Sequence, residues 1–266
     1  MKDIQNEYDS RGIDIQKVGI KNFDIPLKIK RKSNSNQVVN ALADVSVLLP
    51  KHYKGTHMSR FIEILTEWQH KDMLGSDLKG CIESVIKKMS ANSGELHLEF
   101  KYFIDKIAPI SKQASPLCYD CSFTSILSDF GTENEKYKFI LGVKVPVITL
   151  CPCSKEISDY GAHNQRTIVS VKVSYDRNEH IWIEDLIKDI EECASCDIYS
   201  LLKREDEKFV TEKAYDNPKF VEDVLRDVVL MLRNNHIVKE FEIECESLES
   251  IHNHSAWAYQ KEIKDV

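Results

Sequence analysis

The sequence predicts an α+β protein with antiparallel sheet, built from two related modules. Three observations lead to this class. Several runs alternate apolar and other residues, and each half of the chain carries segments with helical apolar spacing. The third is an internal echo, in which a strand-like run, a proline and a polar loop precede His-x-x-Arg at His57–Arg60 and at His163–Arg166. We therefore expect an N-terminal segment, 1–36, and two modules, 37–130 and 131–266.

The elements at the start of the chain follow from its apolar spacing. Residues 1–36 are polar and charged without a sustained period, and 28–37 is typical of an exposed linker or a solvated strand end. A buried strand is expected at 38–49, where Pro50 ends it. Apolar residues at helical spacing then predict a helix within 59–74.

The remaining elements have recognisable starts and ends. A helix is expected after Ser76, which can cap it, and before Gly94, just beyond its end. Another opens at Asn217 and Pro218, with asparagine as the cap and proline at the first helical position. The other predicted elements are a helix at 182–190 and strands at 96–104, 138–150, 167–175 and 237–245.

Composition bounds the function. The 266 residues have a net charge of −7, which argues against a general nucleic-acid coat, because duplex binding relies on a basic field. It leaves room for a small anionic substrate. No apolar run approaches the roughly 20 residues of a membrane-spanning helix, and the N-terminus lacks the apolar core of a secretory signal. We expect a cytoplasmic protein with no membrane partner, whose eight cysteines stay reduced.

Two Cys-x-x-Cys pairs have two interpretations. The pairs Cys118/Cys121 and Cys193/Cys196 are either halves of a tetrahedral zinc site or buried, inactive thiols. The long gap between them, and apolar residues around the second pair, favour buried thiols.

A third pair, Cys151 and Cys153, directly follows a buried strand and opens a polar loop that leads to His163. Rigid scaffolds often hold reactive groups at such strand ends. A thiolate and an imidazole are two ligands of a borderline-soft metal, which a carboxylate or a second imidazole can complete. The alternative is a buried cysteine pair and a surface histidine, and the spacing leaves both open.

Acids and histidines form further candidates. Glu205, Asp206 and Glu207 lie in a charged stretch that is mostly a solvated face. Near the C-terminus, His252 and His254 share a short polar loop with Glu249, where neutral imidazoles suit proton transfer. Glu222 lies among apolar residues near the start of a helix, on its solvent side or as a buried carboxylate. The glycine motifs of Rossmann and P-loop nucleotide sites are missing from the sequence.

Four segments, 48–63, 151–166, 201–227 and 249–258, together resemble GTP cyclohydrolase IB over about residues 10–260. The resemblance implies the tunnelling fold (T-fold), with two tandem modules of antiparallel sheet and paired helices. It also implies a homotetramer with its sites at subunit interfaces. The implied reaction opens the imidazole ring of GTP, releases formate and yields 7,8-dihydroneopterin triphosphate, the first step towards folate.

The resemblance also implies roles for single residues. Cys151, His163 and Glu207 match metal ligands, and His252 matches a histidine at the site, assigned to proton transfer with metal ligation as the alternative. His254 is a further catalytic candidate because it shares the polar loop with His252. Cys153 is a close neighbour of the metal. Glu222 matches the glutamate that anchors the purine, and a carboxylate suits guanine because it accepts from N1–H and the 2-amino group together. The expected triphosphate cations are Lys54, His57, Arg60 and Arg166, with Lys51 and Lys203 as further candidates.

One departure from the family pattern bears on the metal. The segment at 203–208 has Glu205 where a proline is expected before Asp-Glu-Lys, so either Glu205 or Glu207 faces the metal. One divalent ion per site is expected, Zn or Mn, with Fe as a further option. Two other functions stay open: a tunnelling-fold enzyme with a cysteine nucleophile, of the nitrile reductase or pterin synthase type, and a non-catalytic zinc-binding protein.

Overall fold

The computed structural model describes residues 4, 5 and 7–264. These residues form ten strands and six α-helices, which confirms the α+β class. The strands are β1 (Ile15–Lys30), β2 (Asn36–Leu49), β3 (Asp72–Met73), β4 (Gly94–Ile107), β5 (Ala114–Ser128), β6 (Lys136–Leu150), β7 (Asn164–Tyr175), β8 (Cys196–Asp197), β9 (Val238–Leu248) and β10 (Ala256–Ile263). The helices are α1 (Met58–Trp68), α2 (Leu78–Met89), α3 (Pro152–Ile157), α4 (Ile183–Glu192), α5 (Arg204–Asp216) and α6 (Val221–Asn234), with a 3₁₀ turn, η1 (Gly75–Asp77), before α2.

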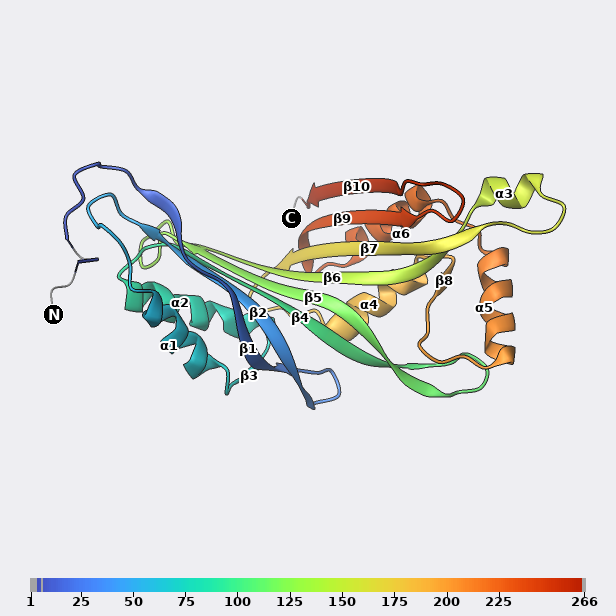
Figure 1. Cartoon of the computed structure of the whole chain (residues 1–266), viewed down its shortest axis with the longest axis horizontal. Coiled ribbons are helices and arrows are strands. Elements are labelled where there is room, and N and C mark those ends of the chain that lie inside the picture. Colours follow the sequence, from blue (N-terminus) through green and yellow to red (C-terminus); the bar gives the residue numbers. More distant parts are fainter. Residues whose placement is uncertain (1–3, 6, 265–266) are drawn as a thin grey trace. The chain divides into compact units, whose positions relative to one another are not determined.

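All ten strands belong to one sheet (Figure 1). Its order is β10-β9-β7-β6-β5-β4-β2-β1-β3, and β8 pairs with β6 off this path. Antiparallel pairs dominate, among them β1 with β2, β2 with β4, and β9 with β10. Because the short β3 runs parallel to β1, the sheet is mixed rather than purely antiparallel.

The chain divides into two compact units that interleave along the sequence. Unit 1 comprises Met1–Lys101, Ser122–Leu141 and Tyr175–His180, and unit 2 comprises Tyr102–Cys121, Gly142–Ser174 and Ile181–Val266. The strands β4, β5, β6 and β7 each contribute residues to both units.

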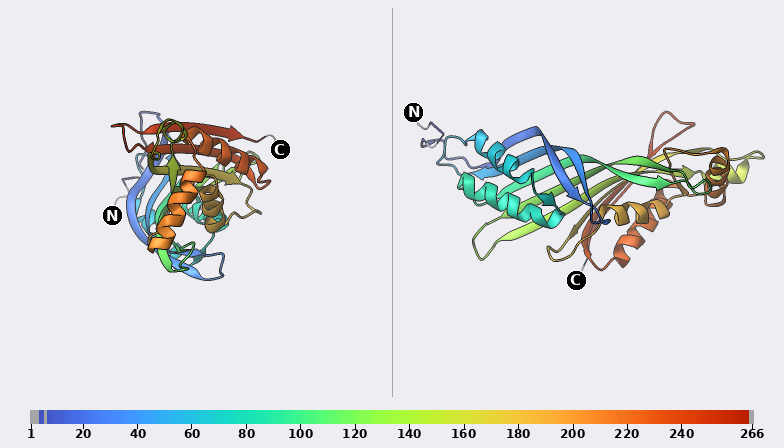
Figure 2. Two further views of the ribbon diagram at one scale, coloured as in Figure 1. Left: turned by 90° about the vertical axis from the view of Figure 1, so that its right-hand side faces the viewer. Right: turned by 90° about the horizontal axis from the view of Figure 1, so that it is seen from below.

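Within unit 1, α1 and α2 lie side by side (Figure 2). Helix α1 buries Phe61, Ile64 and Leu65, which recur at helical spacing. A glycine is needed at position 75, because a Cβ there would approach the ring of Phe139 to 2.2 Å. The apolar spacing of the sequence thus predicts the helical core of this unit.

Within unit 2, α6 packs against β9 and β10 (Figure 1). Its buried face includes Val224, Val228 and Leu232, and strand β9 buries Phe241 and Ile243 beneath it. The C-terminal end of α6 is held by Lys264, whose Nζ donates to the carbonyls of Arg233, Asn235 and Leu232 at 2.9, 2.7 and 3.3 Å. Glu222 lies at the opposite end of this helix, in its first turn.

Residues 15–30, for which the sequence shows no sustained period, form the strand β1, and its exposed end at Lys30 agrees with the expected solvated strand end. The sequence pattern that indicates this strand is the alternation of Ile25, Leu27 and Ile29, all buried. Charged residues around them make the alternation hard to recognise. Gly19 allows β2 to approach closely, since a Cβ there would lie 1.9 Å from the carbonyl oxygen of Val45.

Two predicted helix starts were wrong. Helix α6 begins at Val221, where Asp223 accepts the N–H of Phe220 at 3.1 Å. Asn217 instead ends α5, and its Nδ2 donates to the carbonyl oxygen of Ala194 at 2.9 Å. The N-cap of α2 is Asp77, not Ser76, and the Asp77 carboxylate accepts the N–H of Leu74 at 2.8 Å in the preceding turn.

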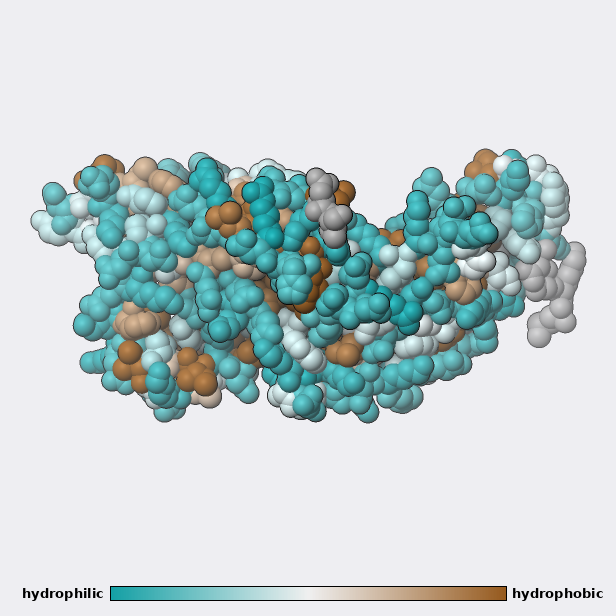
Figure 3. All heavy atoms as spheres, turned by 180° about the vertical axis from the view of Figure 1, so that it is seen from behind, coloured by the Kyte–Doolittle hydropathy of each residue, from teal (hydrophilic) through white to brown (hydrophobic). Residues whose placement is uncertain are grey.

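The internal echo does not correspond to equivalent local structures. His57 precedes helix α1, which contains Arg60, whereas His163 precedes strand β7, which contains Arg166. The two His-x-x-Arg sequences therefore present their side chains from different kinds of element. None of the helices in the described residues has the length and apolar composition to cross a membrane. On the face shown in Figure 3, hydrophobic side chains form small separate groups among hydrophilic ones.

Candidate active site

Cys151 and His163 meet at the end of β6 and the start of β7. The backbone N–H of Cys151 donates to the carbonyl oxygen of His163 at 3.1 Å. Cys151 is also the N-cap of α3, where its Sγ accepts the N–H of Ser154 at 3.4 Å, and Pro152 occupies the first helical position. The hydroxyl of Ser154 accepts the N–H of His163 at 2.9 Å. The short helix thus folds the loop back and brings the backbones of Cys151 and His163 together.

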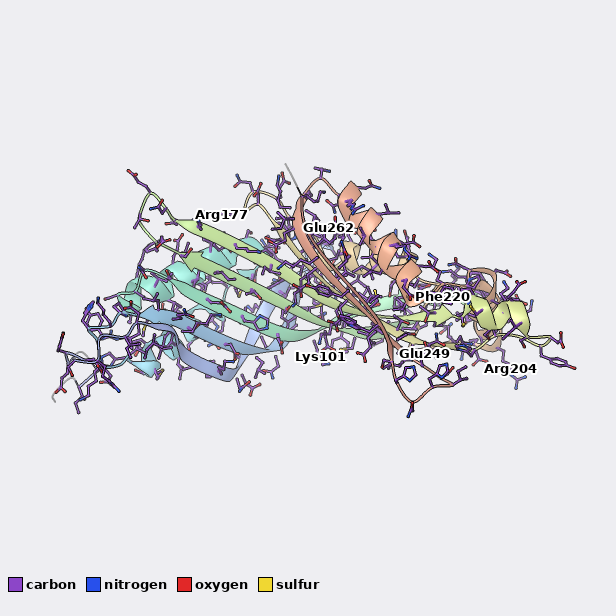
Figure 4. The ribbon with its side chains drawn as sticks, turned by 90° about the horizontal axis from the view of Figure 1, so that it is seen from above. Lys101, Arg177, Arg204, Phe220, Glu249 and Glu262 are labelled. Atoms are coloured by element: carbon purple, nitrogen blue, oxygen red, sulfur yellow. The ribbon has the colours of Figure 1, made fainter. Side chains whose placement is uncertain are left out.

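The imidazole of His163 has two polar neighbours. Its Nδ1 lies 2.9 Å from Oε1 of Gln165 and 3.9 Å from Oε2 of Glu249. The His163 and Glu249 side chains are only 17% and 12% exposed. Glu249 follows strand β9, where the loop to β10 begins (Figure 4). Neither Gln165 nor Glu249 was assigned a role from the sequence, although Glu249 lay in a polar loop already marked as a candidate.

The acids at the start of α5 separate into two kinds. Glu205 and Glu207 are exposed, whereas Asp206 is fully buried. The Asp206 carboxylate accepts the N–H groups of Ile110 and Ser111 at 2.8 and 2.9 Å, the Ser111 hydroxyl at 2.6 Å and the N–H of Lys203 at 2.9 Å. Asp206 therefore caps α5 and ties it to the β4–β5 turn, so both glutamates face outward.

The described residues contain no group of three or more His, Cys, Asp and Glu side chains gathered closely enough to hold a metal. Cys151 and His163 meet through their backbones, but Glu207 does not form a group of three with them. The same finding bears on Cys118, Cys121, Cys193 and Cys196, which form no such group. Burial raises the pKa of Cys193 and of Cys196 to about 11, which disfavours the thiolate form that zinc requires.

The other expected residues of unit 2 are accessible. Cys153 is exposed on α3, and Glu222 is exposed in the first turn of α6, just after Phe220 (Figure 4). His252 and His254 lie in the exposed β9–β10 loop, where their rings stack at a centroid distance of 5.2 Å. The sequence left Glu222 either on the solvent side of its helix or buried, and the structure places it on the solvent side.

The expected cations fall into both units. In unit 1, His57 and Arg60 line a cavity of about 430 Å³ together with Tyr53, and Lys54 pairs with Glu7 at 3.1 Å. In unit 2, Arg166 lines a separate cavity of about 290 Å³. The apolar part of this second cavity comes from Ile148, Ile198, Leu202 and Val210, and its polar part from Asn164, Gln165, Arg166 and Tyr199. Both cavities combine a cation with uncharged polar groups, as anion-binding sites do.

By fold, the chain is an α+β protein similar to solved uricases. A uricase from Bacillus fastidious matches with a TM-score of 0.57 and 9% identity, over 94% of each chain. Urate oxidase from Bacillus subtilis 168 matches with a TM-score of 0.56 and 8% identity, over 94% of this chain and 99% of its own. At such low identity the likeness shows the fold alone.

By sequence, the chain belongs to the type I GTP cyclohydrolase folE2 family, whose model matches residues 1–258. GTP cyclohydrolase FolE2 of Geobacter sp. (strain M21) is 49% identical over 97% of this chain and 93% of its own length. That of Geotalea uraniireducens (strain Rf4) is 50% identical over 97% and 92%, and that of Thermosipho africanus (strain TCF52B) 45% over 97% and 96%. The resemblance of the four segments is thereby confirmed at the level of type I GTP cyclohydrolase.

Proposed function

We propose that the chain is a metal-dependent GTP cyclohydrolase of type IB, which converts GTP to 7,8-dihydroneopterin triphosphate and formate in the first step of folate biosynthesis. The observation that carries the activity is family membership: the match spans residues 1–258, with relatives 45–50% identical along nearly their whole length. The backbone contact that brings Cys151 and His163 together supports the metal dependence. The tunnelling fold and the modules at 37–130 and 131–266 are part of this proposal.

The proposed metal ligands are Cys151, His163 and Glu207, for one divalent ion, Zn or Mn, with Fe as a further option. Their sulfur, nitrogen and oxygen donors fit these metals. A bound divalent ion supplies Lewis-acid activation of a water nucleophile near neutral pH. We further propose that the site lies at a subunit interface and is completed by a second copy, in a homotetramer.

The remaining residues bind GTP and move protons. Glu222 accepts from N1–H and the 2-amino group of guanine, and its exposure in the first turn of α6 leaves the carboxylate free to do so. The exposed imidazoles of His252 and His254 protonate the purine nitrogen and return protons during ring opening. Cys153 lies next to the metal ligand Cys151 in the chain and assists at the site.

The triphosphate requires cations, and we assign it Lys54, His57, Arg60 and Arg166. The cavity that His57 and Arg60 line, and the position of Arg166 beside a second cavity, support this assignment. We expect GTP as the substrate and no partner among membranes or polymeric nucleic acids. The proposed location of the enzyme is the cytoplasm.

The test is a GTP assay across Zn²⁺, Mn²⁺ and Fe²⁺. We expect formate release and, after oxidation, a fluorescent pterin. Chelation should abolish both signals, and restoring the metal should recover them. Metal-loaded protein that leaves GTP unchanged would contradict the proposal. Full turnover without metal, with a covalent substrate adduct on Cys151 or Cys153, would instead favour the cysteine-nucleophile enzyme.

A further inference from the structure

We propose that Gln165 is a positioning residue that holds His163 in the tautomer with its hydrogen on Nδ1. The inference rests on the proposed metal role of His163 and deepens it. Oε1 of Gln165 lies 2.9 Å from Nδ1 of His163. An amide oxygen only accepts hydrogen bonds, so Nδ1 carries the hydrogen and Nε2 keeps the lone pair that a metal ligand needs.

The other end of the same amide determines which way it points. Nε2 of Gln165 donates to Oγ1 of Thr149 at 3.4 Å. An amide turned over would aim its NH₂ group at Nδ1 of His163 and its oxygen at Thr149. That alternative would require Thr149 to donate its hydroxyl hydrogen to Gln165, so the orientation depends on where this hydrogen goes.

Three buried hydroxyls, which we call the hydroxyl ring, decide that point. Thr149, Thr167 and Ser247 are 1%, 0% and 1% exposed and come from the neighbouring strands β6, β7 and β9. Oγ1 of Thr167 donates to Oγ of Ser247 at 3.1 Å. The 2.7 Å contact between Thr149 and Thr167 must then use the hydrogen of Thr149.

The hydroxyl ring therefore only accepts from Gln165. Ser247 lies 3.4 Å from Oγ1 of Thr149 and closes the ring by donating to it, so each hydroxyl hydrogen is used inside the ring. The one lone pair left on Thr149 suits the NH₂ group of Gln165. Because the three hydroxyls lie on adjacent strands of a sheet, the direction of the hydrogen bond from Gln165 to Thr149 is set by a rigid part of the fold.

Glu249 supports the same tautomer from another direction. Its Oε2 lies 3.9 Å from Nδ1 of His163, so its charge favours a hydrogen rather than a lone pair at that atom. Partners of this kind on the far nitrogen of a metal-binding histidine typically change metal affinity 10- to 100-fold. Gln165 is thus assigned to hold the hydrogen on Nδ1 of His163.

The test measures the tautomer and the metal affinity separately, in the full-length protein. Histidine-selective ¹⁵N spectra of the metal-free protein at about pH 8, assigned with His163→Gln, should show His163 with its hydrogen on Nδ1. Gln165→Leu should remove this preference and weaken Zn²⁺ binding, measured by competition with a chelator, by about 10- to 100-fold. Gln165→Glu, which keeps an acceptor at Nδ1, should retain the tautomer.

A second pair of variants tests the ring itself. Thr149→Val should mix the two tautomers of His163, whereas Thr149→Ser, which keeps the hydroxyl, should preserve the preference. The matched control is Thr124→Val, because Thr124 Oγ1 lies 2.7 Å from Nδ1 of His97 in unit 1. This control should change His97 and leave His163 and Zn²⁺ binding as they are.

Two results would overturn the inference: a wild-type His163 with its hydrogen on Nε2, or a Gln165→Leu variant with unchanged tautomer and unchanged zinc affinity. Failure of the proposed function is a different outcome. A wild-type protein with the expected tautomer but no Zn²⁺ binding would overturn the metal site and support the tautomer assignment alone.

Discussion

The backbone N–H of Cys151 donates to the carbonyl oxygen of His163 at 3.1 Å, although twelve positions separate the two residues in the chain. This bond joins the end of β6 to the start of β7, and both residues retain side chains that can bind a metal. A strand end of this kind is rigid, because the sheet on one side and α3 on the other hold it.

From this pairing we predict that Cys151→Ala removes the metal. A thiolate contributes the strongest donor of the proposed set, so metal bound per chain, measured by elemental analysis, should fall by about tenfold or more. The control is Cys118→Ala, a half-buried thiol on β5, which should retain full metal content. Unchanged metal in Cys151→Ala would favour a structural zinc site at other cysteines.

Glu222 provides a second test, now of GTP binding. Glu222→Gln presents a donor to the donors of guanine, and a lost hydrogen bond to a charged group costs about 1.5–3 kcal/mol. We therefore expect KM for GTP to rise about 10- to 100-fold, with metal content unchanged. Glu212→Gln, an exposed acid of α5, is the control and should behave as wild type. A normal KM in Glu222→Gln would remove the anchor role.

How much of this site the sequence predicts depends on whether local or distant contacts decide it. The strand expected at 138–150 is β6, because burial on one face demands alternation that is visible in the sequence. The spacing of Cys151 and His163 left their meeting open, and the fold of α3 with the bond from His163 to Ser154 decides it. The approach of Glu249 to His163 does not follow from the local sequence, since it depends on β9 pairing beside β7 rather than on any local pattern.

The acids of α5 illustrate the same limit. Nothing local distinguishes Asp206 from Glu205 and Glu207, yet only Asp206 is buried. The reason lies in Ile110 and Ser111, almost a hundred positions earlier, whose N–H groups the carboxylate accepts. Asp206 therefore caps the helix instead of facing a metal, and the sequence near α5 does not reveal this because its partners Ile110 and Ser111 are distant in the chain.

His252 provides a third test, of proton transfer. The side chain is exposed in the β9–β10 loop, so His252→Ala should fold and bind metal normally. General acid–base catalysis typically contributes 10²- to 10⁴-fold, and we expect kcat, followed by formate release, to fall within about that range. His236→Ala, an exposed histidine after α6, should keep wild-type turnover. Wild-type kcat in His252→Ala would exclude His252 from the mechanism.

The last prediction concerns a buried ionic network that holds the segment leading to α5. Nζ of Lys106 lies 2.6 Å from Oε2 of Glu191 and 2.9 Å from Oδ2 of Asp197, and Lys213 adds a contact to Asp197 at 3.1 Å. The side chains of Lys106, Glu191 and Asp197 are 13%, 7% and 16% exposed. Removing one partner of such a buried pair leaves a charge uncompensated.

We therefore expect Asp197→Asn to lower the free energy of unfolding by about 3 kcal/mol at pH 7, measured by urea denaturation. The control is Glu192→Gln, which breaks an exposed 3.7 Å pair with Lys188 on α4 and should change stability by less than about 1 kcal/mol. An equal effect of both variants would contradict the special role of the buried network.

The difference in unfolding free energy between wild type and Asp197→Asn should decrease in acid. Burial by itself raises the pKa of Asp197, but the hydrogen bond and charge of Lys106, with help from Tyr199 and Lys213, outweigh it and hold the pKa well below its usual range. A carboxyl whose pKa is lower in the folded state stabilises the fold above the unfolded pKa of about 3.9. That stabilisation is lost as the pH falls from about 4 towards the folded pKa. The gap between wild type and Asp197→Asn should therefore be constant from about pH 5 to 7 and shrink below pH 4, and a gap that widened in acid would show that Asp197 is protonated in the folded protein at neutral pH.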